Sequence, residues 1–137
     1  MADLPGTIPD DLRYTADHEW VALSGEEARV GITAYATEAL GDVVFVDLPA
    51  VGTTVAARER CAEIESTKAV AEVYAPVAGT VVAVNDVLTD QPERIGAEPY
   101  GDGWMFTLAV AEVADIEALL DAAAYRALTE DRSDVAD

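Results

Sequence analysis

The chain has 137 residues, 51% of them apolar, and carries a formal net charge of −19 from 27 acidic and 8 basic side chains. This length suits one domain with a single core that needs no metal or disulfide to fold. The charge argues against nucleic acid and anionic membrane surfaces as partners, because both require basic patches. The one cysteine, Cys61, allows no intramolecular disulfide and is expected to be a buried, unreactive thiol.

The two ends differ in composition from the middle of the chain. Residues 1–11 contain two prolines, a glycine and three aspartates, which predicts a loose leader. This segment lacks the basic and apolar regions of a targeting signal, and no apolar run reaches membrane-spanning length, so we expect a cytoplasmic protein. Residues 129–137 are polar and acidic and predict a frayed tail, which leaves 12–128 as the single domain.

Between these ends, short apolar runs separated by turn residues predict β-strands. We expect strands at 13–23, with a break at Asp17-His18, and at 28–32, 43–48, 55–64, 80–84 and 104–110. Thr33 can cap a helix over 34–39 that ends before Gly41. The run 43–48 is almost entirely apolar and predicts a strand buried on both faces. The stretch 85–103 is rich in Asp, Pro and Gly and predicts a long loop with one helical turn near 86–88.

The hydrophobic period changes near the end of the chain. From Asp115 onward, apolar residues recur on one helical face, which predicts a helix capped by Asp115 and a second short helix starting at Asp121. Many short strands, with helix mainly at the end, predict a mostly β fold built as a small antiparallel sandwich or flattened barrel. Residues 41–46 also resemble residues 79–84, which indicates two similar halves.

Residues 65–70 connect two apolar, β-prone runs, 61–64 and 71–74, and predict a β-hairpin with Thr67 and Lys68 at its turn. Lys68 is the only lysine in the chain, and the other seven basic residues are arginines. A primary amine can be acylated to a stable amide, whereas a guanidinium stays protonated and reacts poorly. The hairpin tip therefore carries the one side chain suited to an amide-linked group, although an arginine-rich chain can also retain one exposed lysine by chance.

The sequence contains few of the motifs that would indicate an independent enzyme. It contains one histidine, His18, and lacks the zinc-protease, paired-cysteine and phosphate-loop motifs. Any fold would bring some of its many carboxylates together, so they predict a solvated surface rather than an acid–base pair. We expect His18 to be hydrogen-bonded near the surface and Trp20 to lie in the core. A carrier is the better prediction, because its cofactor would supply the chemistry.

The hexapeptide Glu65-Ser66-Thr67-Lys68-Ala69-Val70 is accompanied by further motifs. They occupy residues 14–21, 30–33, 40–49, 73–79, 84–85 and 99–104, and include Asp17-His18-Glu19-Trp20 and Pro99-Tyr100-Gly101-Asp102-Gly103-Trp104. In order and spacing these motifs resemble the glycine cleavage system H protein family, and the hexapeptide resembles that family's lipoyl attachment motif. The resemblance covers about residues 12–128. It implies the barrel-sandwich hybrid fold, with the lysine exposed on a hairpin.

The resemblance also implies a function. Lipoate would be linked as an amide to Lys68, on a carrier without turnover of its own. The carrier would take an aminomethyl group from a pyridoxal-phosphate glycine decarboxylase to a tetrahydrofolate-dependent aminomethyltransferase, and a dihydrolipoamide dehydrogenase would reoxidise it. A lipoate ligase or a lipoyl or octanoyl transferase would attach the cofactor. We expect the protein itself to be a monomer.

Two acidic residues, Glu19 and Glu72, match acidic positions of the family. The resemblance implies that these positions hold the amine of the loaded arm. Ala34 and Tyr35 stand where the family commonly has Asp-His, which leaves open any arm contact from that helix. Three alternatives remain. They are a free-standing lipoyl domain of a 2-oxo acid dehydrogenase, a biotin carrier, and a lipoyl-relay or regulatory relative that has lost glycine chemistry. A minimal lipoyl domain lacks the 14–20 block and the C-terminal helix, and a biotin carrier has methionines beside its lysine.

Overall fold

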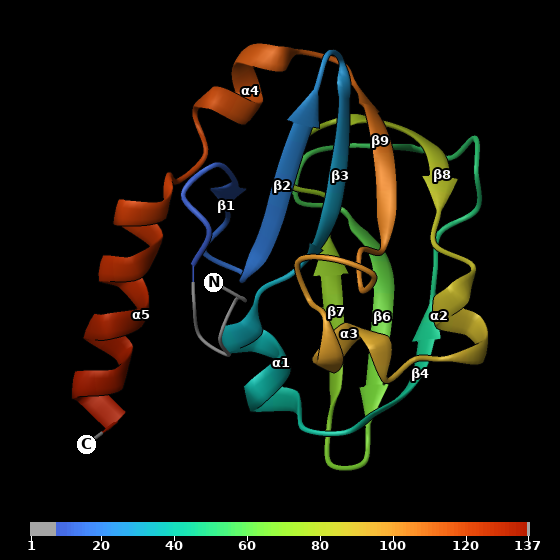
Figure 1. Ribbon diagram of the computed structural model, residues 1–137. Coiled ribbons are helices and arrows are strands. Elements are labelled where there is room, and N and C mark those ends of the chain that lie inside the picture. Colours follow the sequence, from blue (N-terminus) through green and yellow to red (C-terminus); the bar gives the residue numbers. More distant parts are fainter. Residues whose placement is uncertain (1–7, 137) are drawn as a thin grey trace.

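The computed structural model describes residues 8–136, with side chains up to Thr129. In this part of the chain, nine strands form two antiparallel sheets with five helices around them (Figure 1). The larger sheet has the strand order β1-β2-β3-β9-β8-β5, and the smaller sheet has the order β4-β6-β7. The strands are β1 (Arg13–Tyr14), β2 (Glu19–Ser24), β3 (Glu27–Ile32), β4 (Val43–Asp47), β5 (Thr54–Val55), β6 (Arg60–Ser66), β7 (Val70–Tyr74), β8 (Gly79–Val84) and β9 (Phe106–Val110). The helices are α1 (Ala34–Leu40), α2 (Val87–Asp90), α3 (Arg94–Ala97), α4 (Val113–Glu117) and α5 (Ala122–Ala136).

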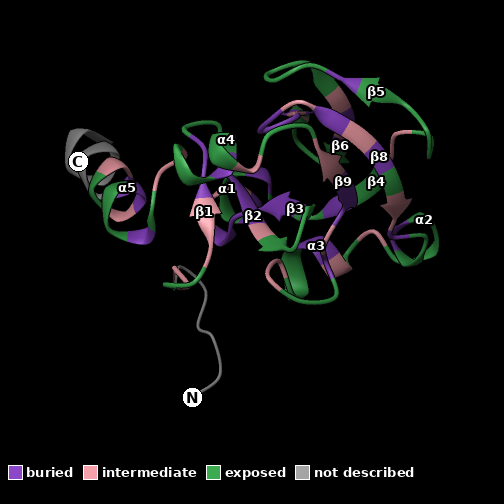
Figure 2. Cartoon of the chain, turned by 90° about the horizontal axis from the view of Figure 1, so that it is seen from above, coloured by how far each residue is buried: buried purple, intermediate pink, exposed green. Residues whose placement is uncertain are grey.

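The main hydrophobic core combines side chains from both sheets. Figure 2 shows buried residues concentrated along β2, β3 and β9. Fully burying an aliphatic or aromatic side chain contributes about 1.5–3 kcal/mol, so this core is the main source of stability. The predicted mostly β architecture is confirmed. Representative core residues are Val30, Val81 and Leu108 from the larger sheet and Val46, Ile64 and Val73 from the smaller.

Strand β4 lies at the edge of the smaller sheet and has one face open to solvent. Val44 and Phe45 are 53% and 54% exposed, whereas Val43 and Val46 are buried. The register with β6 shifts between Val43 and Phe45, which marks a bulge. The prediction of burial on both faces was therefore wrong. An apolar run alone cannot reveal that its strand will be an edge strand of an antiparallel sheet with one solvated face.

Strand β8 has an irregularity that matches the one in β4. Its register with β9 shifts between Val81 and Ala83. When 41–46 is aligned with 79–84, Val82 takes the place of Val44, and both are exposed, at 39% and 53%. The two segments thus share a bulge as well as a sequence pattern, which supports the predicted similarity of the two halves.

The predicted break and the predicted helix near the N-terminal end are both confirmed. His18 has a φ of 72°, which separates β1 from β2. The Thr33 hydroxyl accepts a hydrogen bond from the backbone N–H of Ala36 at 3.3 Å and caps α1. Gly41 ends this helix with a φ of 80° and donates its N–H to the carbonyl oxygen of Thr37. A side chain would strain that backbone conformation.

A second, smaller core fixes the two ends of the domain to each other. The rings of Tyr14 and Tyr125 stack with 4.7 Å between their centroids, and Tyr14 forms a backbone bridge with Leu120. The Tyr125 hydroxyl lies 2.7 Å from both His18 Nδ1 and Thr33 Oγ1. Helix α5 therefore contacts the break between β1 and β2 and also the cap of α1. Trp20 is buried in the same cluster, as predicted.

The C-terminal helices differ in detail from the prediction. Glu112, rather than Asp115, is the cap of α4. Asp121 does start α5, because its carboxylate accepts the Ala124 N–H at 2.8 Å. The helix continues to Ala136, so residues 129–136 are helical where a frayed tail was predicted. Residues 1–7 of the predicted leader lie outside the described residues.

The stretch 85–103 contains more structure than a loop. Helix α2 matches the predicted helical turn, but α3 was not predicted. Ile95 of α3 is fully buried. Gly103 lies against this helix, since a Cβ built on it would approach the Arg94 carbonyl oxygen to 2.8 Å. That close approach, rather than only a turn, accounts for the glycine. Among the described helices, none is long and apolar enough to cross a membrane.

Candidate functional site

Lys68 lies at the turn of the β6–β7 hairpin, which projects at the lower edge of Figure 1. The last paired residues are Glu65 and Val70. Ser66 closes the turn, because its backbone N–H donates to the Ala69 carbonyl oxygen at 2.8 Å. Its hydroxyl accepts the N–H groups of Lys68 and Ala69 at 3.3 and 3.0 Å. The predicted hairpin is confirmed, and one serine fixes the conformation of the lysine's backbone.

The hairpin tip is attached to the segment between α1 and β4. The Thr67 N–H donates to the Asp42 carbonyl oxygen at 3.0 Å. A Cβ built on Gly41 would lie 3.4 Å from Lys68 Cε and 3.9 Å from Nζ, so the lysine side chain crosses this glycine. The bare backbone of Gly41 leaves room for the aliphatic stem of Lys68.

The Lys68 amine fits an acyl attachment site. The side chain is exposed, and among the described residues it takes part in no ion pair. An enzyme that transfers an acyl group can therefore reach the amine without first breaking an internal contact. An amide-linked acyl group needs an accessible primary amine, and this hairpin provides one.

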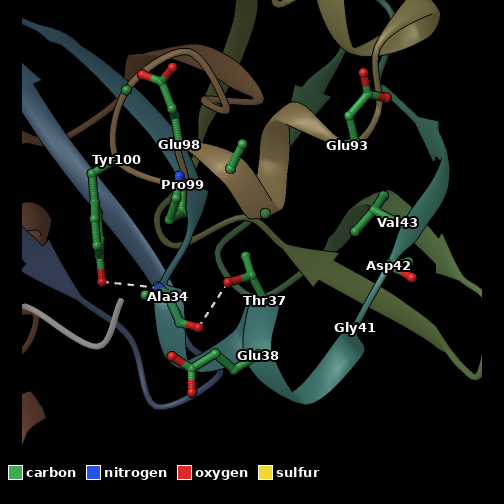
Figure 3. Close-up of a pocket in the computed structure, with 13 residues that line it drawn as sticks. Ala34, Thr37, Glu38, Gly41, Asp42, Val43, Glu93, Glu98, Pro99 and Tyr100 are labelled. Carbon is green, nitrogen blue, oxygen red and sulfur yellow. Dashed lines mark hydrogen bonds between the residues drawn. The ribbon is translucent and has the colours of Figure 1, made fainter. Parts of the chain in front are cut away.

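A cleft of about 820 Å³ is lined in part by Gly41 and Asp42, the segment that contacts the hairpin tip. One wall is the face of α1 that carries Ala34, Thr37 and Gly41, and α3 with the residues after it forms the other. Figure 3 shows carboxylates from Glu38 and Glu98 around it, and the hydrogen bond from the Ala34 N–H to the Tyr100 hydroxyl. Sequence reasoning missed this cleft, because it depends on the unpredicted helix α3. The cleft also runs beside Gly41, over which the lysine lies.

Glu19 is a buried carboxylate at the start of β2, with 1% of its surface exposed. It accepts hydrogen bonds from the Thr15 hydroxyl at 2.8 Å and from the Tyr74 N–H at 2.9 Å. Burial raises its pKa from 4.5 to about 7, and these two hydrogen bonds limit the rise. An incidental surface acid would not have this environment. Glu19 is instead a desolvated carboxyl group, and a nearby cation would stabilise its ionised form.

Glu72 lies on β7, exposed, and opposite Glu63 of β6. Its carboxylate accepts a hydrogen bond from the Tyr74 hydroxyl at 3.0 Å, which raises the pKa of Tyr74. The backbone N–H of the same tyrosine donates to Glu19. The two predicted acids thus share Tyr74 as a partner, although one is buried and the other is exposed. Sequence reasoning did not single out Tyr74, because its role follows from β7 ending beside β2.

The ring of Tyr35, from α1, stacks on His18 with 4.6 Å between centroids. His18 is hydrogen-bonded, as predicted, and its partner is the Tyr125 hydroxyl. Cys61 is a free, partly buried thiol. Burial, with smaller contributions from Glu19 and Glu59, raises its pKa to about 12. A thiol in this state is a poor nucleophile.

The described residues include no group of three or more His, Cys, Asp or Glu arranged for a metal ion.

Comparisons with known proteins identify the family. The family model described as "Glycine cleavage H-protein" matches residues 12–132. The chain is 53% identical over 125 residues to the glycine cleavage system H protein of Cronobacter sakazakii, which covers 90% of this chain and 97% of that protein. It is 55% identical over 119 residues to the probable glycine cleavage system H protein of Haloarcula marismortui, which covers 87% and 94%.

A solved structure agrees with this assignment. The crystal structure of a glycine cleavage system H protein from Mycobacterium marinum matches with a TM-score of 0.83 and 44% identity, covering 90% of this chain and 99% of that one. The two proteins therefore have the same fold and related sequences over nearly the whole domain. The chain belongs to the glycine cleavage H-protein family, as its motifs implied, and its function is that of a lipoyl carrier of the glycine cleavage system rather than of an enzyme.

Proposed function

We propose that Lys68 carries lipoate in amide linkage and presents it to the enzymes of the glycine cleavage system. The observation that carries this proposal is the position of the only lysine, which is exposed at a hairpin tip within a lipoyl-type motif. When bound, lipoate supplies a redox-active dithiolane on a long arm. The chain supplies the attachment amine, the turn held by Ser66, and carboxylates that can receive a cationic load.

The proposed partners are those that the resemblance implies. They are the pyridoxal-phosphate decarboxylase, the tetrahydrofolate-dependent aminomethyltransferase, dihydrolipoamide dehydrogenase, and a ligase or transferase that lipoylates Lys68, all acting on a monomer in the cytoplasm. A reconstituted glycine–bicarbonate exchange assay with the lipoylated protein tests this assignment. Exchange that depends on the carrier supports it. Lack of exchange, together with turnover by a 2-oxo acid dehydrogenase, would favour the free-standing lipoyl domain instead.

Glu19 and Glu72 are proposed to hold the amine of the aminomethyl group while Lys68 carries it. Glu72 lies four positions after Lys68, at most about 13 Å away along an extended chain, a span that an extended arm can bridge. The exposed Glu72 alone would contribute only about 0.2–1 kcal/mol. Glu19 would contribute more, because attraction between charges is stronger in a desolvated site. Holding the amine there would protect the load from water between the two enzymes.

The rate of spontaneous aminomethyl loss tests this docking. We expect the Glu19→Gln/Glu72→Gln protein, once loaded, to lose the group roughly tenfold faster than wild type, since about 1.4 kcal/mol of holding energy corresponds to a factor of ten. Glu27→Gln is the matched control, because Glu27 is an exposed acid at the end of β3 away from Glu19, which pairs with Ile32, and is expected to have no effect. Equal rates of loss in all three proteins would show that these carboxylates do not hold the amine.

The net charge of −19 predicts electrostatic steering toward basic docking surfaces on the partners. Salt shortens the screening length to about 8 Å at physiological ionic strength. We therefore expect the KM of the decarboxylase for this carrier to rise several-fold between low and high salt, while kcat changes little. The same salt series with free lipoamide as acceptor is the control for effects on the enzyme itself. A KM that stays constant for the carrier would rule out steering.

A further inference from the structure

Arg58 has a backbone conformation that is unusual for its residue type. Its φ is 71°, in the left-handed region that favours glycine, in the short segment between β5 and β6. The neighbouring chain holds it there. The Arg58 N–H donates to the Ala75 carbonyl oxygen at 2.8 Å, and the Ala75 N–H donates to the Glu59 carbonyl oxygen at 2.8 Å. Such conformations persist where the surroundings fix them and occur often at functional sites.

The Arg58 side chain reaches the turn that precedes Glu19. Its Nη2 lies 3.1 Å from Asp17 Oδ2, with the two side chains 64% and 33% exposed. The Asp17 N–H donates to the Thr15 hydroxyl at 3.2 Å, and the same hydroxyl donates to the Glu19 carboxylate. Asp17 therefore lies beside the buried carboxylate and closer to solvent. Its charge raises the pKa of Glu19, and the Arg58 guanidinium lowers it.

These contacts place the Arg58 cation against Asp17, in the turn that leads into the buried Glu19 carboxyl group. We propose that Arg58 is the resting counter-ion of the Asp17–Glu19 carboxylates and competes with the amine of the transferred group for them. The proposal rests on the docking of that amine at Glu19. When the group is absent, Arg58 compensates the acids. When it arrives, its amine takes the place of the guanidinium at Asp17, so Arg58 limits how tightly the load is held and eases its release to the next enzyme.

The test uses two substitutions at Arg58 in the full-length, lipoylated protein. Asn tolerates the left-handed backbone and removes the charge, whereas Lys keeps a cation at the same position. We expect loaded Arg58→Asn to lose the aminomethyl group about two- to fivefold more slowly than wild type, the range that an exposed ion pair supplies. Arg58→Lys should lose it at close to the wild-type rate.

A second variant separates this proposal from the docking proposal. In a Glu19→Gln background, Arg58→Asn should change the rate of loss far less, because the amine meets Arg58 at Asp17 only while it is docked at Glu19. If Glu19→Gln alone speeds loss but Arg58→Asn matches wild type, docking stands and the role of Arg58 is overturned. If Glu19→Gln alone has no effect, docking itself fails and the role of Arg58 falls with it.

A measurement without the load tests the counter-ion role directly. Carboxyl carbon NMR of the unloaded protein can follow Glu19. The charged or titratable groups near it include His18, Asp17, Arg58, Cys61 and Tyr74, with Glu72 beyond the tyrosine. We expect the Glu19 titration to shift to higher pH in Arg58→Asn and to stay in place in Arg58→Lys. An unchanged titration in Arg58→Asn would overturn the proposal.

Discussion

Lys68→Arg is expected to abolish lipoylation and carrier activity completely while leaving the fold intact. The side chain is exposed and makes no ion pair among the described residues, so its replacement by another long cation breaks no charge pair and leaves the core untouched. Arginine keeps the positive charge but cannot be acylated in the same way. Intact mass after incubation with lipoate and the attaching enzyme should increase by one lipoyl group for wild type and by none for the variant.

A shifted lysine provides the control for position. In Thr67→Lys/Lys68→Arg the amine moves one residue along the same turn, away from Gly41 and its cleft. We expect this protein to be lipoylated poorly or not at all, because the turn orients residue 68 through the Ser66 hydroxyl. Lipoate found elsewhere on the Lys68→Arg chain, or glycine exchange sustained by it, would contradict the assignment of the site.

Glu19→Gln is expected to stabilise the unloaded protein at alkaline pH. A rise in the carboxyl pKa from 4.5 to about 7 corresponds to roughly 3 kcal/mol of unfavourable burial once the group is ionised. Gln keeps one of the two partners, since its oxygen can accept the Tyr74 N–H, whereas its amide would face a Thr15 hydroxyl that already accepts two backbone N–H groups. Denaturant unfolding at pH 8 should therefore show the variant to be more stable by up to that amount.

The pH dependence follows from the direction of the shift. Between 4.5 and about 7 the folded protein binds a proton at Glu19 that the unfolded chain has released. Wild-type stability therefore falls, relative to Glu19→Gln, as pH rises through this window, and the difference should vanish below it. Glu72→Gln, which changes an exposed acid, should show no such trend. A difference between Glu19→Gln and wild type that stays constant from pH 4 to pH 8 would contradict this account.

Local sequence rules predicted much of what forms the attachment site. Ser66, Thr67 and Lys68 form a turn because short polar residues connect two β-prone runs. Thr33 and Gly41 delimit α1 through capping chemistry that depends only on neighbouring residues. These features were predictable because their hydrogen bonds stay within a few residues of the chain.

The environment of the carboxylates was not predictable in the same way. Glu19 is buried because β7 ends beside it and supplies the Tyr74 N–H, a contact across 55 residues. The pair formed by Arg58 and Asp17 likewise depends on the packing of separate turns. The exposed face of β4 and the burial of Ile95 in α3 also follow from tertiary packing. Hydrophobic patterns report that a residue is apolar, but they do not report which neighbour covers it.

The stacking of Tyr14 on Tyr125 has a consequence for synthesis of the protein in the cell. The Tyr125 hydroxyl joins His18 to Thr33, the cap of α1, and Tyr125 lies 107 positions after His18 in the chain. The turn that presents Asp17 and Glu19 therefore cannot acquire its final contacts on the ribosome until Tyr125 has emerged. The β6–β7 hairpin depends mainly on local pairing and can form earlier. Lys68 thus reaches its place in the turn before the acids proposed to receive its load, and this order of maturation is set by the 107 positions between His18 and Tyr125.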